Sequence, residues 1–303
     1  MKSIRIGTRG SPLALAQAVW VKEKLQEKYP EARIETILIK TSGDRFAEAS
    51  VQAIGGKGIF TKEIEDALLR REIDIAVHSM KDLPTELVAG LIVAAVPRRE
   101  DPRDVLVNPS GKKLSELFAG ARLATGSLRR RAQLLFYRRD LMIVPIRGNV
   151  DTRLKKLDRG ECDALVMAAA GLKRIDREER IVEYISNQVC LGAPGQGALG
   201  LESREDDTVR EALSFVHDSA TFAEVTAERS FLNRLGGGCH VPVGAHGVAE
   251  GDQLKLLGVV AEPDGRALFR GEISGGVTQA KELGRDLAER LLSQGAGKIL
   301  VAQ

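Results

Sequence analysis

The chain has 303 residues, of which 43% are hydrophobic and 29% charged, with a formal net charge of +3. This length favours two or three domains, and the composition excludes an intrinsically disordered or fibrous protein. The small net charge alone gives no reason to expect polyanion binding. The longest apolar stretch, residues 87–97, is too short to span a bilayer, and the first residues lack a signal peptide's apolar segment, so we expect neither a membrane location nor export.

The three cysteines are far apart in the sequence and form no Cys-x-x-Cys pair. Cys162, Cys190 and Cys239 therefore indicate neither a disulfide framework nor a structural zinc site. We expect a cytoplasmic protein that needs no metal.

Residues 1–98 predict alternating strands and helices. Strands are expected at 4–8, 34–39 and 73–77, and helices at 13–29, after the cap-like Ser11-Pro12, and at 61–70. A polar, glycine-containing loop at 41–58 has the composition of a mobile lid.

The same pattern recurs further along the chain. Strands are expected at 122–125, 142–146 and 164–167, and helices at 127–137 and 150–159. Segments around Pro102 and Pro194 lie between the two repeats and predict crossover strands, as in a hinged two-lobe protein. After residue 219 the sequence predicts a helix to Leu235, three strands ending near Ile273 and a helix at 277–293.

We therefore predict an α/β fold with two βαβ lobes and a small α+β third domain. The predicted first lobe comprises residues 1–98 and 195–217, the second residues 99–194, and the third domain residues 218–303.

Two strand-to-helix turns carry residues suited to anions. Gly7-Thr8-Arg9-Gly10-Ser11 and Thr125-Gly126-Ser127-Leu128-Arg129-Arg130 combine backbone amides, hydroxyls and guanidinium groups. Further arginines follow later strands, where ligands bind in open α/β sheets. Arginine suits planar carboxylates, so a substrate with many carboxylates is indicated. Capped helices with solvated arginines are the alternative interpretation.

Three other segments suggest chemistry. His78-Ser79-Met80-Lys81-Asp82-Leu83-Pro84 places a cation beside an anion at the end of a buried strand, although a plain turn with solvated charges would look the same. Lys57 lies in a glycine-rich segment without Walker A spacing, which disfavours nucleotide binding. Three glycines precede Cys239 and permit another group to approach its thiol, although a generic buried cysteine is the simpler reading.

Taken together, these segments resemble the porphobilinogen deaminase family over nearly the whole chain. The shared motifs are Gly-Thr-Arg-Gly-Ser-Pro-Leu-Ala-Leu-Ala-Gln, Gly-Gly-Lys-Gly-Ile-Phe-Thr-Lys-Glu, His-Ser-Met-Lys-Asp-Leu-Pro and Gly-Gly-Cys. The resemblance implies two lobes like those of type II periplasmic binding proteins. It also implies a transferase that joins four porphobilinogen units on a dipyrromethane cofactor, releases ammonia and then frees hydroxymethylbilane by hydrolysis.

The resemblance also implies roles for individual residues. Cys239 would carry the dipyrromethane as a thioether, and Asp82 would stabilise cationic charge on the substrate and transfer protons. The residues implied to bind the carboxylates of cofactor and substrate, or to match the family's binding turns and lid, are Arg9, Ser11, Lys57, Phe60, Ser79, Lys81, Thr125, Ser127, Arg129, Arg130, Arg147, Arg153, Arg174, Gln196 and Arg229. One departure is visible, because Gly236 and His240 stand where the family commonly has Glu and Gln.

Two other classes of function compete with this interpretation. A two-lobe receptor for a small anion fits the paired turns but not the expected lack of an export signal. A nucleic-acid-binding module is disfavoured because the arginines lie at separate turns and aromatic residues make up only 4% of the chain. We expect a monomer that binds porphobilinogen and neither nucleic acid nor membrane.

Overall fold

The computed structural model describes residues 3–42, 61–205, 208–236 and 241–301. By their contacts, residues 1–99 and 198–222 form one compact unit, and residues 100–197 and 223–303 form a second. This grouping joins the C-terminal region to residues 100–197, and the predicted three-domain boundaries stay a prediction. Among the described residues, no helix is long and apolar enough to cross a membrane.

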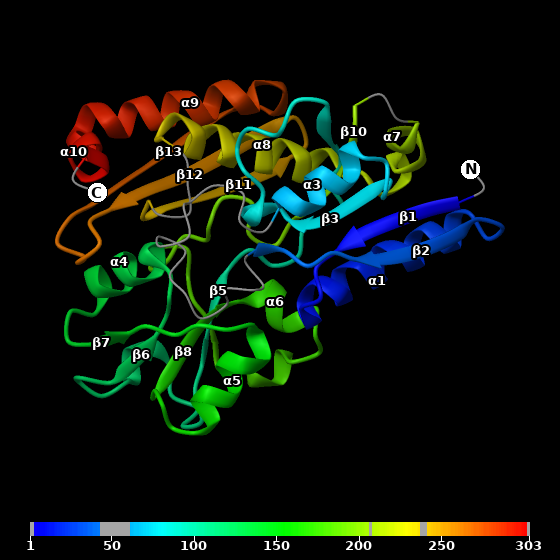
Figure 1. Cartoon of the computed structure of the whole chain (residues 1–303). Coiled ribbons are helices and arrows are strands. Elements are labelled where there is room, and N and C mark those ends of the chain that lie inside the picture. The colour runs from blue at the N-terminus through cyan, green and yellow to red at the C-terminus, as the bar shows by residue number, and fades with distance from the viewer. Residues whose placement is uncertain (1–2, 43–60, 206–207, 237–240, 302–303) are drawn as a thin grey trace. The chain divides into compact units, whose positions relative to one another are not determined.

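The first unit contains a five-stranded sheet of order β2-β1-β3-β10-β4. Its strands are β1 (Ser3–Thr8), β2 (Arg33–Leu38), β3 (Ile75–Ser79), β4 (Leu91–Ala95) and β10 (Leu199–Arg204). The first three are parallel, and β10 is antiparallel to both of its neighbours. Helices α1 (Pro12–Lys28) and α3 (Lys62–Leu69) cover opposite faces of this sheet (Figure 1). A short α7 (Val209–Ala212) follows β10.

Side chains that alternate along β3 supply the cores on both faces of this sheet. Ile75 and Val77 pack in the cluster that includes Leu25 of α1. Ala76 packs in the cluster that includes Ile64 of α3. This period of two residues is what a strand buried on both faces requires.

The second unit repeats the strand order in a sheet β7-β6-β8-β5-β9. Its strands are β5 (Asp104–Val107), β6 (Arg122–Ala124), β7 (Met142–Val144), β8 (Ala164–Ala168) and β9 (Glu183–Tyr184). Here β6, β7 and β8 are parallel and β5 is the antiparallel crossover strand. The helices are α4 (Leu128–Tyr137), α5 (Val150–Asp158) and α6 (Ala169–Lys173). The repeated order confirms the predicted pair of lobes with crossover strands.

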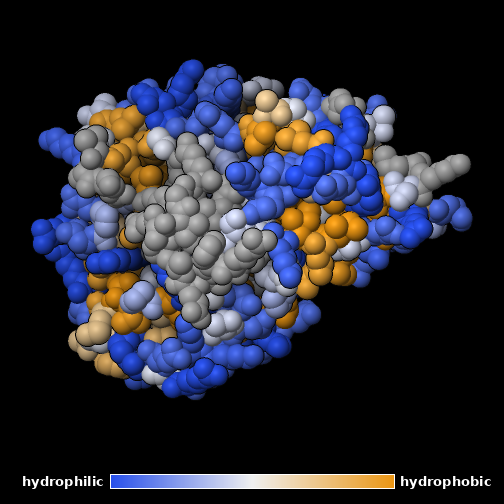
Figure 2. Space-filling view, in the orientation of Figure 1, coloured by the Kyte–Doolittle hydropathy of each residue, from blue (hydrophilic) through white to orange (hydrophobic). Residues whose placement is uncertain are grey.

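The C-terminal region adds an antiparallel sheet of β11 (Val243–Glu250), β12 (Gln253–Ala261) and β13 (Leu268–Gly276). Its helices are α8 (Ser219–Arg234), α9 (Ala280–Leu291) and α10 (Gly297–Val301). Phe231, Leu256 and Leu287 are fully buried in its core, and the exposed residues of α9 are all charged, so that this edge is hydrophilic in Figure 2. This region confirms the small α+β domain.

Single turns complete the described chain. They are the 3-10 turns η2 (Met80–Asp82), η3 (Leu114–Glu116), η4 (Glu178–Arg180), η5 (Ser214–Val216) and η6 (Val277–Gln279), and the π turn η7 (Leu292–Ala296).

Candidate functional site

The turn between β1 and α1 leaves helix amides and a hydroxyl at the end of a strand. Ser11 is the N-cap, and its side chain accepts a hydrogen bond from the Ala14 amide at 3.3 Å. Pro12 begins the helix, and the first turn contains no acidic residue. The partial positive charge of a helix N-terminus therefore meets no carboxylate of its own, which suits an external anion. Arg9 is partly exposed in this turn.

The turn after β3 presents Asp82. Met80 and Leu83 are buried, whereas Lys81 is half-buried and Asp82 is exposed. The turn is fixed by hydrogen bonds from the Met80 amide to the Ala198 carbonyl and from the Leu83 amide to the Met80 carbonyl, at 3.0 and 3.2 Å. Two buried anchors thus hold the Lys81-Asp82 dipeptide outward.

Both turns lie at one edge of the first sheet. Ile6 pairs with Ile75 and Gly7 with Ala76 in the parallel β1–β3 ladder, so the carboxyl ends of the two strands are neighbours. Ser79 at the end of β3 accepts a hydrogen bond of 2.8 Å from Gln17 of α1, which ties the two turns together. The predicted residues Arg9, Ser11, Ser79, Lys81 and Asp82 therefore share one edge.

The turn between β6 and α4 repeats the first arrangement in the second unit. Ser127 caps α4 by accepting a hydrogen bond from the Arg130 amide at 3.4 Å, and the first turn again lacks acidic residues. The buried Thr125 accepts a hydrogen bond from the Ser127 amide at 3.2 Å. A Cβ on Gly126 would lie 2.9 Å from the Ile146 carbonyl oxygen, so glycine permits the close packing of this turn.

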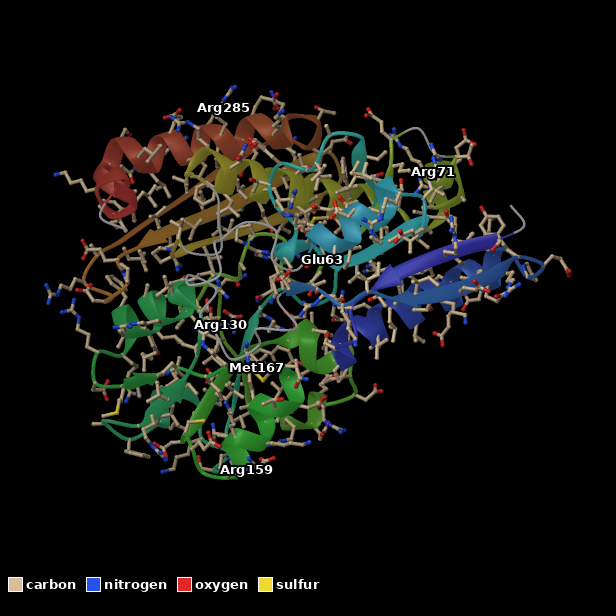
Figure 3. The ribbon with its side chains drawn as sticks, viewed as in Figure 1. Glu63, Arg71, Arg130, Arg159, Met167 and Arg285 are labelled. Atoms are coloured by element: carbon tan, nitrogen blue, oxygen red, sulfur yellow. The ribbon has the colours of Figure 1, made fainter. Side chains whose placement is uncertain are left out.

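Arg129 and Arg130 point into the protein and share the buried Asp104. Arg129 Nη1 lies 2.7 Å from Asp104 Oδ2, while Arg130 Nε and Nη2 lie 3.1 and 2.8 Å from Asp104 Oδ1. Arg130, labelled in Figure 3, also donates to the Val166 carbonyl at 3.1 Å. Burial alone would raise the pKa of Asp104, but the two guanidinium groups outweigh it and hold that pKa far below its usual range. The predicted contact of these two arginines with a ligand stays a prediction.

Two further arginines flank the turn between β7 and α5. Asn149 caps α5 by accepting a hydrogen bond from the Thr152 amide at 2.9 Å. Gly148 has a φ of 111°, and Arg153 Nε donates to its carbonyl at 2.8 Å. Arg147 is exposed. Because β6 and β7 are parallel neighbours, this turn lies at the same sheet edge as Ser127.

Arg174 and Gln196 contact the crossover segment. Arg174 Nη2 donates to the Gly197 carbonyl at 2.6 Å, and burial lowers the pKa of Arg174 to about 10 despite the charge of Glu100. Gln196 is buried, and its amide donates to the Pro102 carbonyl and to Asp104 at 2.7 and 2.9 Å. Gln196 therefore links the crossover segment to the Asp104 cluster.

The C-terminal region contributes Arg229, which is half-buried on α8 beside the fully buried Glu228. Glu228 accepts hydrogen bonds from the Gly195 and Gly247 amides at 2.6 and 2.8 Å, which joins α8 to the crossover segment. Lys57, Phe60 and Cys239 lie outside the described residues, as does most of the predicted lid at 41–58.

The donor set suits carboxylates rather than a metal ion. In the part of the chain that the structure describes, no group of three or more His, Cys, Asp or Glu residues could hold a metal. Both sheet edges instead offer capped helix N-termini without acidic first turns, accompanied by arginine or lysine. Such an arrangement fits the acetate and propionate groups of a dipyrromethane.

Sequence reasoning missed the two buried carboxylates that organise the second unit. Asp104 is the first residue of β5 and is followed by three apolar residues, and an acidic residue there signals a buried partner. Glu228 lies on α8 among buried apolar residues such as Ala227 and Phe231, and the sequence motifs point only to its neighbour Arg229.

Comparisons with known proteins agree over nearly the whole chain. The family model described as "Porphobilinogen deaminase, dipyromethane cofactor binding domain" matches residues 4–212, and "Porphobilinogen deaminase, C-terminal domain" matches residues 222–293. Porphobilinogen deaminase of Pelobacter propionicus is 51% identical over 300 residues, covering 99% of this chain and 96% of that protein. The protein of the same name from Desulforudis audaxviator is 53% identical over 300 residues, covering 99% of this chain and 97% of that protein.

Similar solved structures are more distant. A putative methionine-binding lipoprotein of Bacillus subtilis has a TM-score of 0.43 at 15% identity, covering 71% of this chain and 90% of its own. The methionine-binding protein MetQ has a TM-score of 0.44 at 13% identity, covering 70% and 86%.

Proposed function

Because this chain belongs to the porphobilinogen deaminase family, we propose that the sheet-edge turns described above are its substrate and cofactor site, with Asp82 as the catalytic residue. The protein is a transferase of tetrapyrrole biosynthesis that joins four porphobilinogen units head to tail on a dipyrromethane cofactor. Ammonia leaves at each addition, and water finally releases hydroxymethylbilane. The roles of individual residues are the proposal.

The observation that carries the proposal is the exposed carboxylate of Asp82 on a turn that is otherwise anchored. Met80 and Leu83 are buried on either side, so the carboxylate is presented without moving the strand behind it. Loss of ammonia from porphobilinogen leaves positive charge on the substrate, and a fixed anion stabilises that charge as it develops. The same carboxylate accepts the proton that the newly joined pyrrole ring must lose.

Carboxylate binding is assigned to the turns of both sheets. Each substrate unit carries an acetate and a propionate group, so every addition brings two more negative charges. The residues proposed to receive them are Arg9, Ser11, Ser79 and Lys81 at the first sheet edge, Thr125, Ser127, Arg147, Arg153 and Arg174 at the second, and Arg229 on α8. Arg129 and Arg130 are proposed to act with them, held in place by Asp104.

The dipyrromethane is proposed to be attached through sulfur to Cys239, with Lys57 and Phe60 in a lid. When bound, this group supplies the pyrrole carbon to which the first substrate unit is joined. The turns capped by Ser11 and Ser127 fit its side-chain carboxylates without using any acidic residue of the chain. We also propose that the protein works as a monomer in the cytoplasm, which accords with Cys162 and Cys190 being free thiols.

The test of Asp82 is a comparison of Asp82→Asn with Asp82→Glu. We expect Asp82→Asn to abolish porphobilinogen consumption while the thermal unfolding midpoint stays unchanged, because the side chain is exposed. Asp82→Glu keeps the charge and should retain part of the turnover. Near-normal turnover by Asp82→Asn would remove Asp82 from the mechanism.

The attachment site is tested separately by intact mass. The native protein should exceed its polypeptide mass by one dipyrromethane, and Cys239→Ser should lose both this excess and the activity. Cys190→Ser is the matched control, because Cys190 is buried against Asp104 and should leave the excess mass in place. An active protein of unmodified mass would contradict the assignment.

A further inference from the structure

Three ionisable side chains that the reaction does not use lie buried behind the Asp82 turn. They are His78 on β3, Glu202 on β10 and Glu65 on α3, with exposed fractions of 5%, 0% and 5%. His78 Nε2 lies 3.0 Å from Glu202 Oε2. We call these three residues the buried triad.

Strand alternation explains why the buried triad shares one face of the first sheet. Ala76 packs against α3, and His78 follows it by two residues, so both side chains lie on the α3 face. Glu202 pairs with Ala76 in the antiparallel β3–β10 ladder and therefore lies on the same face. Glu65 reaches this face from α3, where it is buried beside Ile64 and Leu68.

The triad contains more acid than base. His78 is hydrogen-bonded to Glu202, and one carboxylate oxygen of Glu202 and one of Glu65 are buried without a hydrogen-bond partner among the described residues. A charged Glu65 would be a buried anion beside the charge of Glu202, which is unfavourable. Burial, followed by the charge of Glu202, raises the pKa of the Glu65 carboxyl. Arg204 at the end of β10 is engaged with Asp74 and with the Leu68 and Ile73 carbonyls.

We propose that the buried triad positions the Asp82 turn: the His78–Glu202 hydrogen bond fixes β3 against β10, and Glu65 takes part as an uncharged acid. The inference rests on the proposed role of Asp82, which lies four residues after His78. A strand buried among apolar side chains alone can shift along its neighbours, whereas a hydrogen-bonded polar pair specifies one register. Gly200, which pairs with His78, lets the turn pack closely against β10. A Cβ at this position would lie 2.8 Å from the Leu83 side chain and 3.2 Å from the Met80 side chain.

Two isosteric substitutions separate the roles within the triad. Glu202→Gln removes the charge that faces His78, whereas Glu65→Gln resembles the uncharged acid already present. We expect Glu202→Gln to lower kcat by between about tenfold and a hundredfold, because a small displacement of a catalytic group has that effect. Its KM for porphobilinogen should rise less than kcat falls, because Ser79 and Lys81 are the proposed carboxylate-binding residues that lie on the displaced turn. For Glu65→Gln we expect kcat within about twofold of the wild type. Glu31→Gln, at an exposed glutamate of the same unit, is the control.

Two measurements address Glu65 even where Glu202→Gln fails to fold. Just above pH 4.5 the infrared spectrum of the wild type should contain a carbonyl stretch of a protonated carboxyl group that the spectrum of Glu65→Gln lacks. Because the pKa of Glu65 is raised in the folded chain, folding takes up a proton. Wild-type stability is therefore lost as the pH rises from the ordinary value of 4.5 through the raised value. Glu65→Gln should not show this loss. The difference between its denaturation midpoint and that of the wild type should therefore shift in favour of Glu65→Gln as the pH rises above 4.5.

The outcomes distinguish this inference from the proposed function. Equal losses of kcat in Glu65→Gln and Glu202→Gln, or a wild-type spectrum without the protonated-acid band, would overturn the triad while leaving Asp82 in place. Full turnover by Asp82→Asn would instead overturn the role of Asp82, and the infrared band would persist. An unchanged kcat in a folded Glu202→Gln variant would also refute positioning by the triad.

Discussion

Replacing Asp104 by Asn is expected to destabilise the second unit strongly. Asp104 is fully buried and accepts hydrogen bonds from Arg129, Arg130 and Gln196. Asn keeps the size of the side chain but removes the negative charge, which leaves two buried guanidinium groups without compensation. Breaking a buried ion pair in this way costs about 3–5 kcal/mol. For a unit of this size the unfolding midpoint should fall by roughly 6–20 °C.

Asp101→Asn provides the matched control. Asp101 pairs with Arg103, whose side chain is 42% exposed, so its loss should cost less than about 1 kcal/mol. Calorimetry or urea unfolding followed by circular dichroism measures both variants. The same preparations should show that Asp104→Asn carries less covalently bound dipyrromethane, because the α4 turn is displaced. A loss of stability below about 1 kcal/mol in Asp104→Asn would refute the reasoning.

Three other predictions concern single residues of the second unit. Burial raises the pKa of Cys190 to about 12, so iodoacetamide at pH 8 should modify Cys190 only after unfolding. Rapid alkylation of Cys190 in the folded protein would contradict this prediction. Gly197→Ala should lower the free energy of unfolding in urea by about 2–5 kcal/mol, because φ is 89° and the new Cβ would lie 2.3 Å from the Glu100 carbonyl oxygen. An unchanged free energy of unfolding would disprove the contact. Ser127→Asp should keep the helix cap and the folding stability yet raise the KM for porphobilinogen about tenfold, because it opposes a carboxylate. An unchanged KM would remove Ser127 from the binding site.

Local pattern predicts the regular elements of this chain well. The expected helix at 13–29 is observed at Pro12–Lys28, and the expected strand at 164–167 is observed at Ala164–Ala168. Both carry apolar residues at the correct period and clear end signals, so the sequence alone defines them. The strand β4 at Leu91–Ala95 lies in the apolar stretch at 87–97, for which the sequence predicts no element. A short apolar run has no period that distinguishes a strand from a buried helix.

The candidate site is less predictable because side-chain direction depends on tertiary partners. Ser11 and Ser127 act as the expected caps, since capping is local. Arg129 and Arg130 lie just after Ser127 and look like ligand-binding residues, but the structure turns both toward Asp104, which lies 25 and 26 residues earlier on a crossover strand. Such a pairing is non-local, so the sequence signals a buried partner for Asp104 without indicating which arginines supply it.

The position of β10 in the first sheet also governs how the chain folds as it leaves the ribosome. β10 lies between β3 and β4, yet it begins at Leu199, after every strand of the second sheet. At a synthesis rate of roughly 5–20 residues per second, β10 emerges on the order of 5–20 s after β3 and β4. During that interval the edges of β3 and β4 that β10 will cover are unpaired, and such edges are sites of aggregation. The lobe encoded in the middle of the chain therefore completes its sheet before the lobe encoded first.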